Sequence, residues 1–194
     1  MTNKVPLVKP KSKAQIELDI HFLLLKLQPA AFRDNSEIDI ETIFEIDLPD
    51  IIPGLKTGYI DLSHLGTNVM GFTDAKEKVS FVHKELADAT DTVSIRRFRA
   101  TVAHEVSHCL YHLPALSSFK SFSSTFGTEL YRVDRRKIKP YLDPEWQAWK
   151  YAGALLMPKE RILKLIGEGC DEYDIADIFN VNPAFVKARM GALK

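Results

Sequence analysis

The segment from Ser94 to Leu113 constrains the fold most strongly, because apolar residues and two histidines recur in it at the period of an α-helix. Its apolar stripe consists of Phe98, Val102, Val106, Cys109 and Leu113, and Pro114 ends the pattern. His104 and His108 are four residues apart, so a helix stacks their side chains on one face. The sequence therefore predicts one helix that carries both a core-facing stripe and a histidine pair.

The histidine pair belongs to the pattern His-Glu-x-x-His, read here as His104, Glu105, Val106, Ser107 and His108. Two stacked imidazoles can bind one Zn²⁺ ion, and Glu105 beside them can act as a general base. Zinc lowers the pKa of a bound water to roughly 7, and the base removes a proton as the water oxygen attacks a carbonyl. The alternative is a pair of exposed helix histidines without a metal, and the pattern favours the zinc site.

A catalytic zinc site needs a third protein ligand and one open position. His112 continues the histidine face, but it lies about 12 Å from His104 along a helix axis, too far for a shared metal. It is a candidate substrate contact instead. Glu145 is the best third ligand, because it begins the next predicted helix and small residues at 148 and 152 allow that helix to approach closely. A first-turn carboxylate stabilised by the helix dipole explains Glu145 equally well.

Two blocks of sequence carry a resemblance to a known family. The first is Arg97-Phe98-Arg99-Ala100-Thr101-Val102-Ala103-His104-Glu105-Val106-Ser107-His108, and the second is Glu145-x-x-Ala148-x-x-Tyr151-Ala152-x-x-Leu155-Leu156-Met157-Pro158. Together they resemble the ImmA/IrrE family of metallopeptidases, whose usual signature is RFTxAHExxH followed by ExxAxxFAxxLLMP. Here Tyr151 replaces Phe, Ser107 stands where Gly is common, and the 36 residues between His108 and Glu145 exceed the usual spacing.

The resemblance implies a zinc site built from His104, His108 and Glu145, with Glu105 as the base. It also implies a zincin-like, gluzincin-related fold and the cleavage of helix-turn-helix repressors, often of phages or mobile elements. The oxyanion would be held by zinc and one further donor. The candidate donors are Tyr111, His112, Tyr131 and Arg132.

The remaining patterns predict an α+β fold with a small antiparallel or mixed sheet on the zinc helix. Helices are expected over Ala14–Leu27, Asp39–Ile46 and Pro144–Met157, and strands over Tyr59–Leu62, Val69–Thr73 and Val79–His83, arranged as a meander. Residues 47–58 and 115–142 are expected to be connections, since the first holds two prolines and two glycines and the second is poorly patterned. The strand Val79–His83 either accepts an extended substrate through its backbone or is an ordinary edge strand.

The C-terminal region is expected to pack on the peptidase-like part of the chain. We assign residues 1–158 to a zincin-like domain and residues 159–194 to a helical, helix-turn-helix-like extension. Basic residues of the last helix suggest DNA, but acidic residues 171, 172, 174 and 177 precede them, and 26 basic residues are balanced by 26 acidic ones. Packing against the core or repressor docking is therefore favoured over direct DNA binding.

The remaining composition indicates a reduced, folded protein. Cys109 and Cys170 form no metal-binding or disulfide pattern, and the apolar runs are too short to cross a membrane. The polar N-terminal residues lack an apolar signal region, so we expect a cytoplasmic protein.

The sequence as a whole predicts a zinc-dependent endopeptidase of narrow specificity that cleaves a regulatory protein, and the family resemblance implies that this protein is a helix-turn-helix repressor. The alternative is a zincin-fold binding module that inactivates the repressor by contact alone. An intact Glu105 argues against this alternative, because a pure binding module needs no general base.

Overall fold

The computed structural model describes residues 4–6, 8–32, 37–66, 68–114, 132–134 and 138–193. The helical elements are α1 (Lys13–Leu27), η1 (Pro29–Phe32), α2 (Ile40–Thr42), η2 (Ile43–Asp47), α3 (Leu48–Ile51), η3 (Ser63–Leu65), α4 (Lys84–Ala87), α5 (Thr92–Ser107), η4 (His108–His112), η7 (Pro140–Leu142), α7 (Pro144–Leu156), α8 (Lys159–Gly167), α9 (Glu172–Phe179) and α10 (Pro183–Leu193). The strands are β1 (Lys4–Pro6), β2 (Lys56–Ile60), β3 (Gly71–Asp74), β4 (Val79–His83) and β5 (Arg132–Asp134). The expected α+β class is confirmed.

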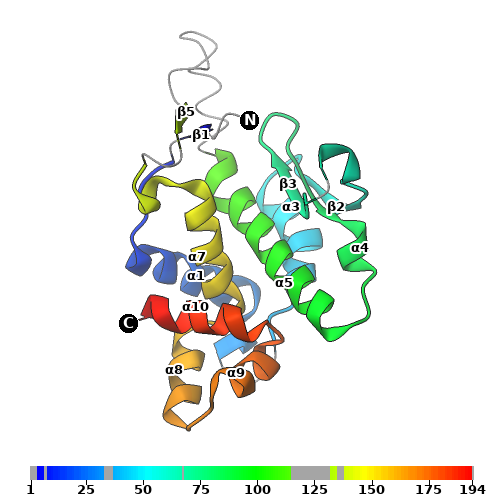
Figure 1. The fold of residues 1–194 in the computed structure, drawn as a ribbon. Coiled ribbons are helices and arrows are strands. Elements are labelled where there is room, and N and C mark those ends of the chain that lie inside the picture. The colour runs from blue at the N-terminus through cyan, green and yellow to red at the C-terminus, as the bar shows by residue number, and fades with distance from the viewer. Residues whose placement is uncertain are drawn as a thin grey trace.

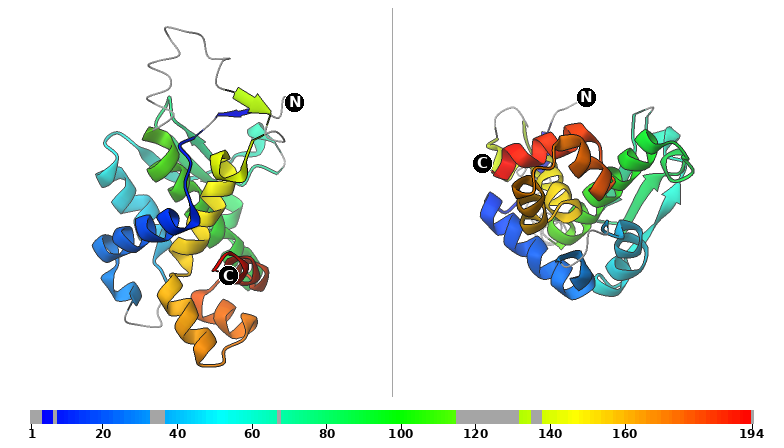
Figure 2. Two further views of the ribbon diagram at one scale, coloured as in Figure 1. Left: turned by 90° about the vertical axis from the view of Figure 1, so that its left-hand side faces the viewer. Right: turned by 90° about the horizontal axis from the view of Figure 1, so that it is seen from below.

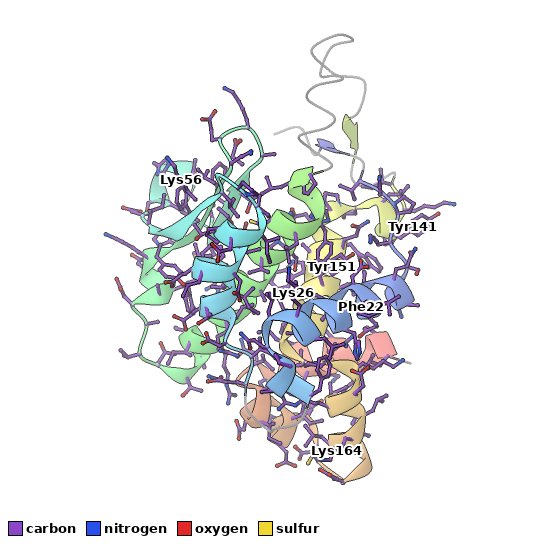
Figure 3. All side chains as sticks on the ribbon, turned by 180° about the vertical axis from the view of Figure 1, so that it is seen from behind. Phe22, Lys26, Lys56, Tyr141, Tyr151 and Lys164 are labelled. Atoms are coloured by element: carbon purple, nitrogen blue, oxygen red, sulfur yellow. The ribbon has the colours of Figure 1, made fainter. Side chains whose placement is uncertain are left out.

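Helices α5 and α7 lie side by side at the centre of the fold (Figure 1). The strands β3 and β4 pack on one side of α5, and α1 packs against α7 on the side away from the sheet (Figure 2). Tyr151 of α7 lies where α1 passes this helix (Figure 3), and its hydroxyl donates to Asp19 of α1 at 2.6 Å. The helix pair at the centre therefore connects the sheet to the N-terminal helix.

Side chains cap the first turns of the main helices. Ser12 forms a capping box with Gln15, and the side chain of Asp91 accepts from the backbone N–H of Ser94 at 3.0 Å. Asp143 precedes Pro144 and accepts from the N–H of Glu145 at 3.0 Å. The three long helices are thus confirmed, and the one expected over residues 94–113 changes to a π-helical turn at η4.

The sheet is mixed, and its order is β2-β4-β3. Strands β3 and β4 form the expected antiparallel pair, but β2 pairs with β4 in parallel. The expected meander is therefore wrong, because β4, the last of the three strands in the sequence, lies between β2 and β3. Strand β2 also starts at Lys56, inside an expected loop, directly after a turn in which Gly54 adopts a φ of 82°.

The expected connection over residues 47–58 is in part helical. Pro49 lies in the first turn of α3, where proline is tolerated, and the π-helical turn η2 precedes it. In the other expected connection, residues 115–142, the described parts are β5, residues 138–139 and η7. Strand β5 pairs antiparallel with β1.

The C-terminal helices share one hydrophobic core with the rest of the chain. Buried residues of α8, α9 and α10 belong to the same cluster as residues of α1, α5 and α7. Arg189 of α10 is 5% exposed, donates to the carbonyl oxygen of Met157 at 3.1 Å, and pairs through both terminal nitrogens with the Glu17 carboxylate. Residues 159–193 are thus anchored to α1 and α7.

This anchor predicts a large stability effect for Arg189→Met. The substitution leaves the Glu17 carboxylate without its partner, so we expect the free energy of unfolding to fall by about 3 kcal/mol. The exposed Lys187 on the same helix provides the control, since Lys187→Met is expected to change stability by less than about 0.5 kcal/mol. Urea unfolding measures both, and equal midpoints for the two variants would contradict the anchor.

No helix in the described part of the chain is long and apolar enough to cross a membrane.

Candidate metal centre

Three side chains from two helices converge at the point where α5 passes the first turn of α7. The Nε2 atoms of His104 and His108 are 3.0 Å apart. Glu145 places Oε2 at 3.2 Å from Nε2 of His104 and Oε1 at 3.3 Å from Nε2 of His108. All three residues thus offer a ligand atom within 4.8 Å of the others, close enough to hold one metal ion.

The spacing of these atoms fits a tetrahedral metal. Ligands about 2.1 Å from a tetrahedral ion lie roughly 3.4 Å from one another. The Nε2 atoms of His104 and His108 are 3.0 Å apart, and Glu145 offers one oxygen at 3.2 Å from His104 and the other at 3.3 Å from His108, all close to that value. The group can therefore take an ion with small adjustments of the side chains.

The packing of α7 on α5 brings Glu145 to the histidines. Ala148 and Ala152 are fully buried in the contact between the helices, as their small side chains suggest. The sequence left open whether Glu145 is a metal ligand or a first-turn carboxylate stabilised by the helix dipole. Glu145 lies in the first turn of α7 and also faces the histidines, so its position is compatible with both roles. The predicted ligands His104, His108 and Glu145 thus lie together.

The Glu145 carboxylate is held in its charged form. Burial would raise its pKa, but hydrogen bonds with His104 and His108 outweigh this effect and hold the pKa well below the usual range. A charged carboxylate is the form that binds a cation.

Glu105, the predicted general base, lies beside the metal-binding group and is 5% exposed. Thr73 of β3 donates its hydroxyl hydrogen to Oε2 of Glu105 at 2.5 Å. Since Thr73 uses its one hydrogen there, Ser80 donates to the Thr73 oxygen, at 2.8 Å. Burial raises the pKa of the Glu105 carboxyl, while His108, His104 and the bond from Thr73 oppose this effect. The two hydroxyls therefore orient a carboxylate with an increased affinity for a proton.

Gly71 allows the edge strand to approach Glu105. A β-carbon at this position would lie 2.8 Å from Cδ and 2.9 Å from Cγ of Glu105, closer than atoms of side chains pack. The strand beside the site is therefore β3, whereas the sequence suggested Val79–His83, which is the central strand β4. Sequence analysis missed Gly71 and Thr73, because nothing local indicates which residues of a short strand face the helix.

A cleft of about 580 Å³ opens beside the metal-binding group. Its walls come from β3 and the residues before it, from α5, from α7 and from α10 with the preceding turn. The lining residues are Asn68, Met70, Gly71, Arg97, Ala100, Thr101, His104, Glu105, Glu145, Trp149, Asn182, Ala184, Phe185 and Ala188. The ring of Trp149 lies 4.4 Å from that of His104, centroid to centroid. The C-terminal helix is thus a wall of the site, which sequence analysis did not anticipate.

Two of the candidate oxyanion donors, Tyr111 and His112, do not reach this cleft. Tyr111 stacks on Tyr151 at 3.6 Å between ring centroids, and His112 is buried behind His108. Neither residue lines the cleft. Tyr131 lies outside the described residues, and Arg132 is described only through the backbone of β5.

Comparison with known proteins adds no family assignment. No protein-family model matches the chain, and no curated protein matches it significantly. The resemblance to the ImmA/IrrE family therefore rests on the two sequence blocks, and the ligand geometry rests on the structure.

Proposed function

We propose that this protein is a zinc-dependent endopeptidase that cleaves a regulatory protein, a helix-turn-helix transcriptional repressor. The observation that carries the proposal is the convergence of His104, His108 and Glu145 at an open cleft, with Glu105 beside them. Structural zinc sites use four protein ligands, whereas catalytic sites use three and leave one position open. The three-ligand group at the cleft supports a catalytic role.

The donor set supports zinc as the resident metal. Two imidazole nitrogens and one carboxylate are the ligands of the zinc sites in several hydrolases. Hard cations such as Mg²⁺ and Ca²⁺ prefer sites built from oxygen ligands. Two neutral nitrogen ligands among three therefore favour zinc over those ions.

The chemistry is hydrolysis of a peptide bond by water. A zinc ion held by His104, His108 and Glu145 would supply a Lewis acid that acidifies water and polarises the substrate carbonyl. Glu105 accepts a proton from the attacking water as the new C–O bond forms, and it returns that proton to the leaving nitrogen as the C–N bond breaks. Thr73 and Ser80 hold the carboxylate in place during both transfers.

The free edge of β3 supports a peptide as the substrate. This strand pairs with β4 on one side, and among the described residues no strand pairs with its other side. An extended peptide could add there through backbone hydrogen bonds. The cleft continues from this edge to α10, so the C-terminal helix would contact side chains of the substrate. The repressor itself is proposed from the sequence resemblance, as is action in the cytoplasm.

The structure also bears on the DNA-binding alternative. Among the basic residues of the last helix, Arg189 is buried and paired with Glu17, so it is not available to contact phosphate. Asp177 of α9 pairs with Arg96 of α5 at 2.5 Å. The turn between α9 and α10 contributes Asn182 to the cleft wall. These contacts favour a role within the peptidase over DNA recognition.

The experiment that tests the proposal is co-expression with the helix-turn-helix repressor encoded beside the gene. Wild type and Glu105→Gln are compared, and the repressor is analysed by intact mass spectrometry. A pair of fragments that appears only with wild type, and whose masses add up to the repressor plus one water, supports the peptidase. An intact repressor that co-purifies equally with both proteins would instead support the binding module.

Gly71→Ala is expected to lower peptide hydrolysis by roughly 10- to 100-fold at unchanged zinc affinity. The added methyl group displaces the Glu105 carboxylate from β3 and from Thr73, and misplacing a catalytic group by about 1 Å can cost 100-fold. Gly191→Ala is the matched control, since a β-carbon at position 191 meets no atom within 4 Å. Initial cleavage rates and zinc titrations measure both variants. Wild-type rates for Gly71→Ala would show that the contact with β3 does not position the base.

A further inference from the structure

His108 uses its second ring nitrogen in a buried chain of hydrogen bonds. Its Nδ1 lies 2.9 Å from Nδ1 of His112, and Nε2 of His112 lies 3.1 Å from Oε1 of Gln147. The Nε2 of Gln147 donates to the backbone carbonyl oxygens of Lys9 and Tyr141, each at 2.8 Å. The chain thus runs from the metal-binding group to the segments before α1 and α7.

The two carbonyls determine the direction of every hydrogen bond in this chain. A carbonyl oxygen can only accept, so the NH₂ group of Gln147 faces Lys9 and Tyr141, and its oxygen faces His112. That oxygen also only accepts, so the proton of His112 is on Nε2. The Nδ1 of a neutral His112 is then an acceptor, and His108 donates its Nδ1–H to it. With a metal ion bound, the lone pair of His108 is then on Nε2, the atom that faces His104 and Glu145.

Burial keeps water away from these hydrogen bonds. His112 and Gln147 are each 1% exposed, so water cannot replace a lost hydrogen bond without a rearrangement. The π-helical turn η4 begins at His108 and ends at His112, and it brings the two rings together edge to face, at 4.9 Å between centroids. A neutral imidazole is also the form that donates through one nitrogen and accepts through the other.

We propose that His112 and Gln147 are positioning residues of the metal centre, which hold His108 in the tautomer and orientation that bind the ion. This chain of hydrogen bonds ends at the backbone carbonyl oxygens of Lys9 and Tyr141. Metal affinity therefore depends on the docking of residues far from the histidine pair in the sequence. The inference rests on the proposed metal centre and is independent of which peptide bond is cleaved.

The test uses two substitutions of His112 with opposite expectations. Phenylalanine keeps the ring but cannot accept from His108, so we expect His112→Phe to weaken zinc binding 10- to 100-fold. Asparagine leaves a cavity, but its side-chain oxygen can take the place of Nδ1, so we expect His112→Asn to weaken zinc binding less than His112→Phe. A residue that only fills space would give the reverse order, because phenylalanine fills the site better. Zinc affinity is measured on the full chain by competition with a fluorescent chelator.

Further measurements separate this role from folding and from the proposed activity. Gln147→Leu is expected to weaken zinc binding 10-fold or more, and thermal unfolding in chelator shows whether the metal-free variant is folded. Long-range ¹H–¹⁵N spectra of the zinc-loaded protein are expected to place the His112 proton on Nε2, and a proton on Nδ1 would overturn the inference. Equal zinc affinities of wild type and His112→Phe would also overturn it. If His112→Phe binds zinc more weakly than wild type but wild type cleaves no repressor, the inference is upheld and the proposed function is contradicted.

Discussion

The Glu105→Gln variant is expected to lose peptide hydrolysis by a factor of roughly 100 to 10,000 and to bind zinc as wild type does. General base catalysis typically contributes that range, and a neutral amide cannot accept the proton of water. Glutamine keeps the shape of the side chain, and its oxygen can still accept from Thr73. The metal-binding atoms of His104, His108 and Glu145 are unchanged.

Two measurements decide this prediction. Cleavage of the co-expressed repressor is followed by mass spectrometry, and zinc affinity is measured by chelator competition on the purified variant. The exposed Glu85 provides a control of the same chemistry, since Glu85→Gln should cleave at the wild-type rate. Cleavage by Glu105→Gln at a rate near that of wild type would remove Glu105 from the proposed mechanism.

The Glu145→Gln variant is expected to bind zinc at least about 100-fold more weakly. Loss of a residue that hydrogen-bonds to a metal ligand already lowers metal affinity 10- to 100-fold in many sites, and loss of the ligand itself lowers it more. Glu145 also supplies the negative charge that faces both imidazoles. An amide oxygen is a weaker ligand and carries no charge.

Thermal unfolding of the same variant with and without zinc shows whether Glu145 is a metal ligand or only a first-turn carboxylate that interacts with the helix dipole. Zinc bound by α5 and α7 stabilises the folded state, by about 4 kcal/mol at 1,000 times its dissociation constant. For a chain of this size this corresponds to a rise in Tm of roughly 10 °C. We expect wild type to show this rise on addition of zinc, and Glu145→Gln to show about a third of it or less, because a 100-fold weaker site leaves about 1.4 kcal/mol at the same zinc concentration.

The matched control lies in the first turn of another helix. Glu172 lies one residue after the N-cap Asp171 of α9, and Glu145 lies two residues after the N-cap Asp143 of α7, so both are first-turn carboxylates. Glu172→Gln removes a first-turn charge without touching the metal centre, so its Tm should rise with zinc as in wild type. An equal zinc-dependent rise for Glu145→Gln would show that Glu145 is not a ligand.

Local patterns in the sequence determined the helices that carry the site and the candidate residues on them. The four-residue spacing of His104 and His108 predicts that both lie on one helix face, and the helix expected from Pro144 is α7. These predictions hold because an α-helix is formed by contacts between residues three or four positions apart. The second sequence block made Glu145 a candidate ligand, while its approach to the histidines depended on the packing of α7 on α5.

Only the tertiary structure decided which distant residues meet at these helices. Thr73 and Gly71 reach Glu105 because β3 is the edge strand and presents them to α5, and a shift of one residue in a strand would turn both away. His112 bonds to Gln147, which in turn donates to the carbonyl oxygen of Lys9, 138 residues away from it in the sequence. Helix α10 lines the cleft because the whole core packs α10 against α7. Such contacts depend on the packing of the whole core, and no local period in the sequence encodes them.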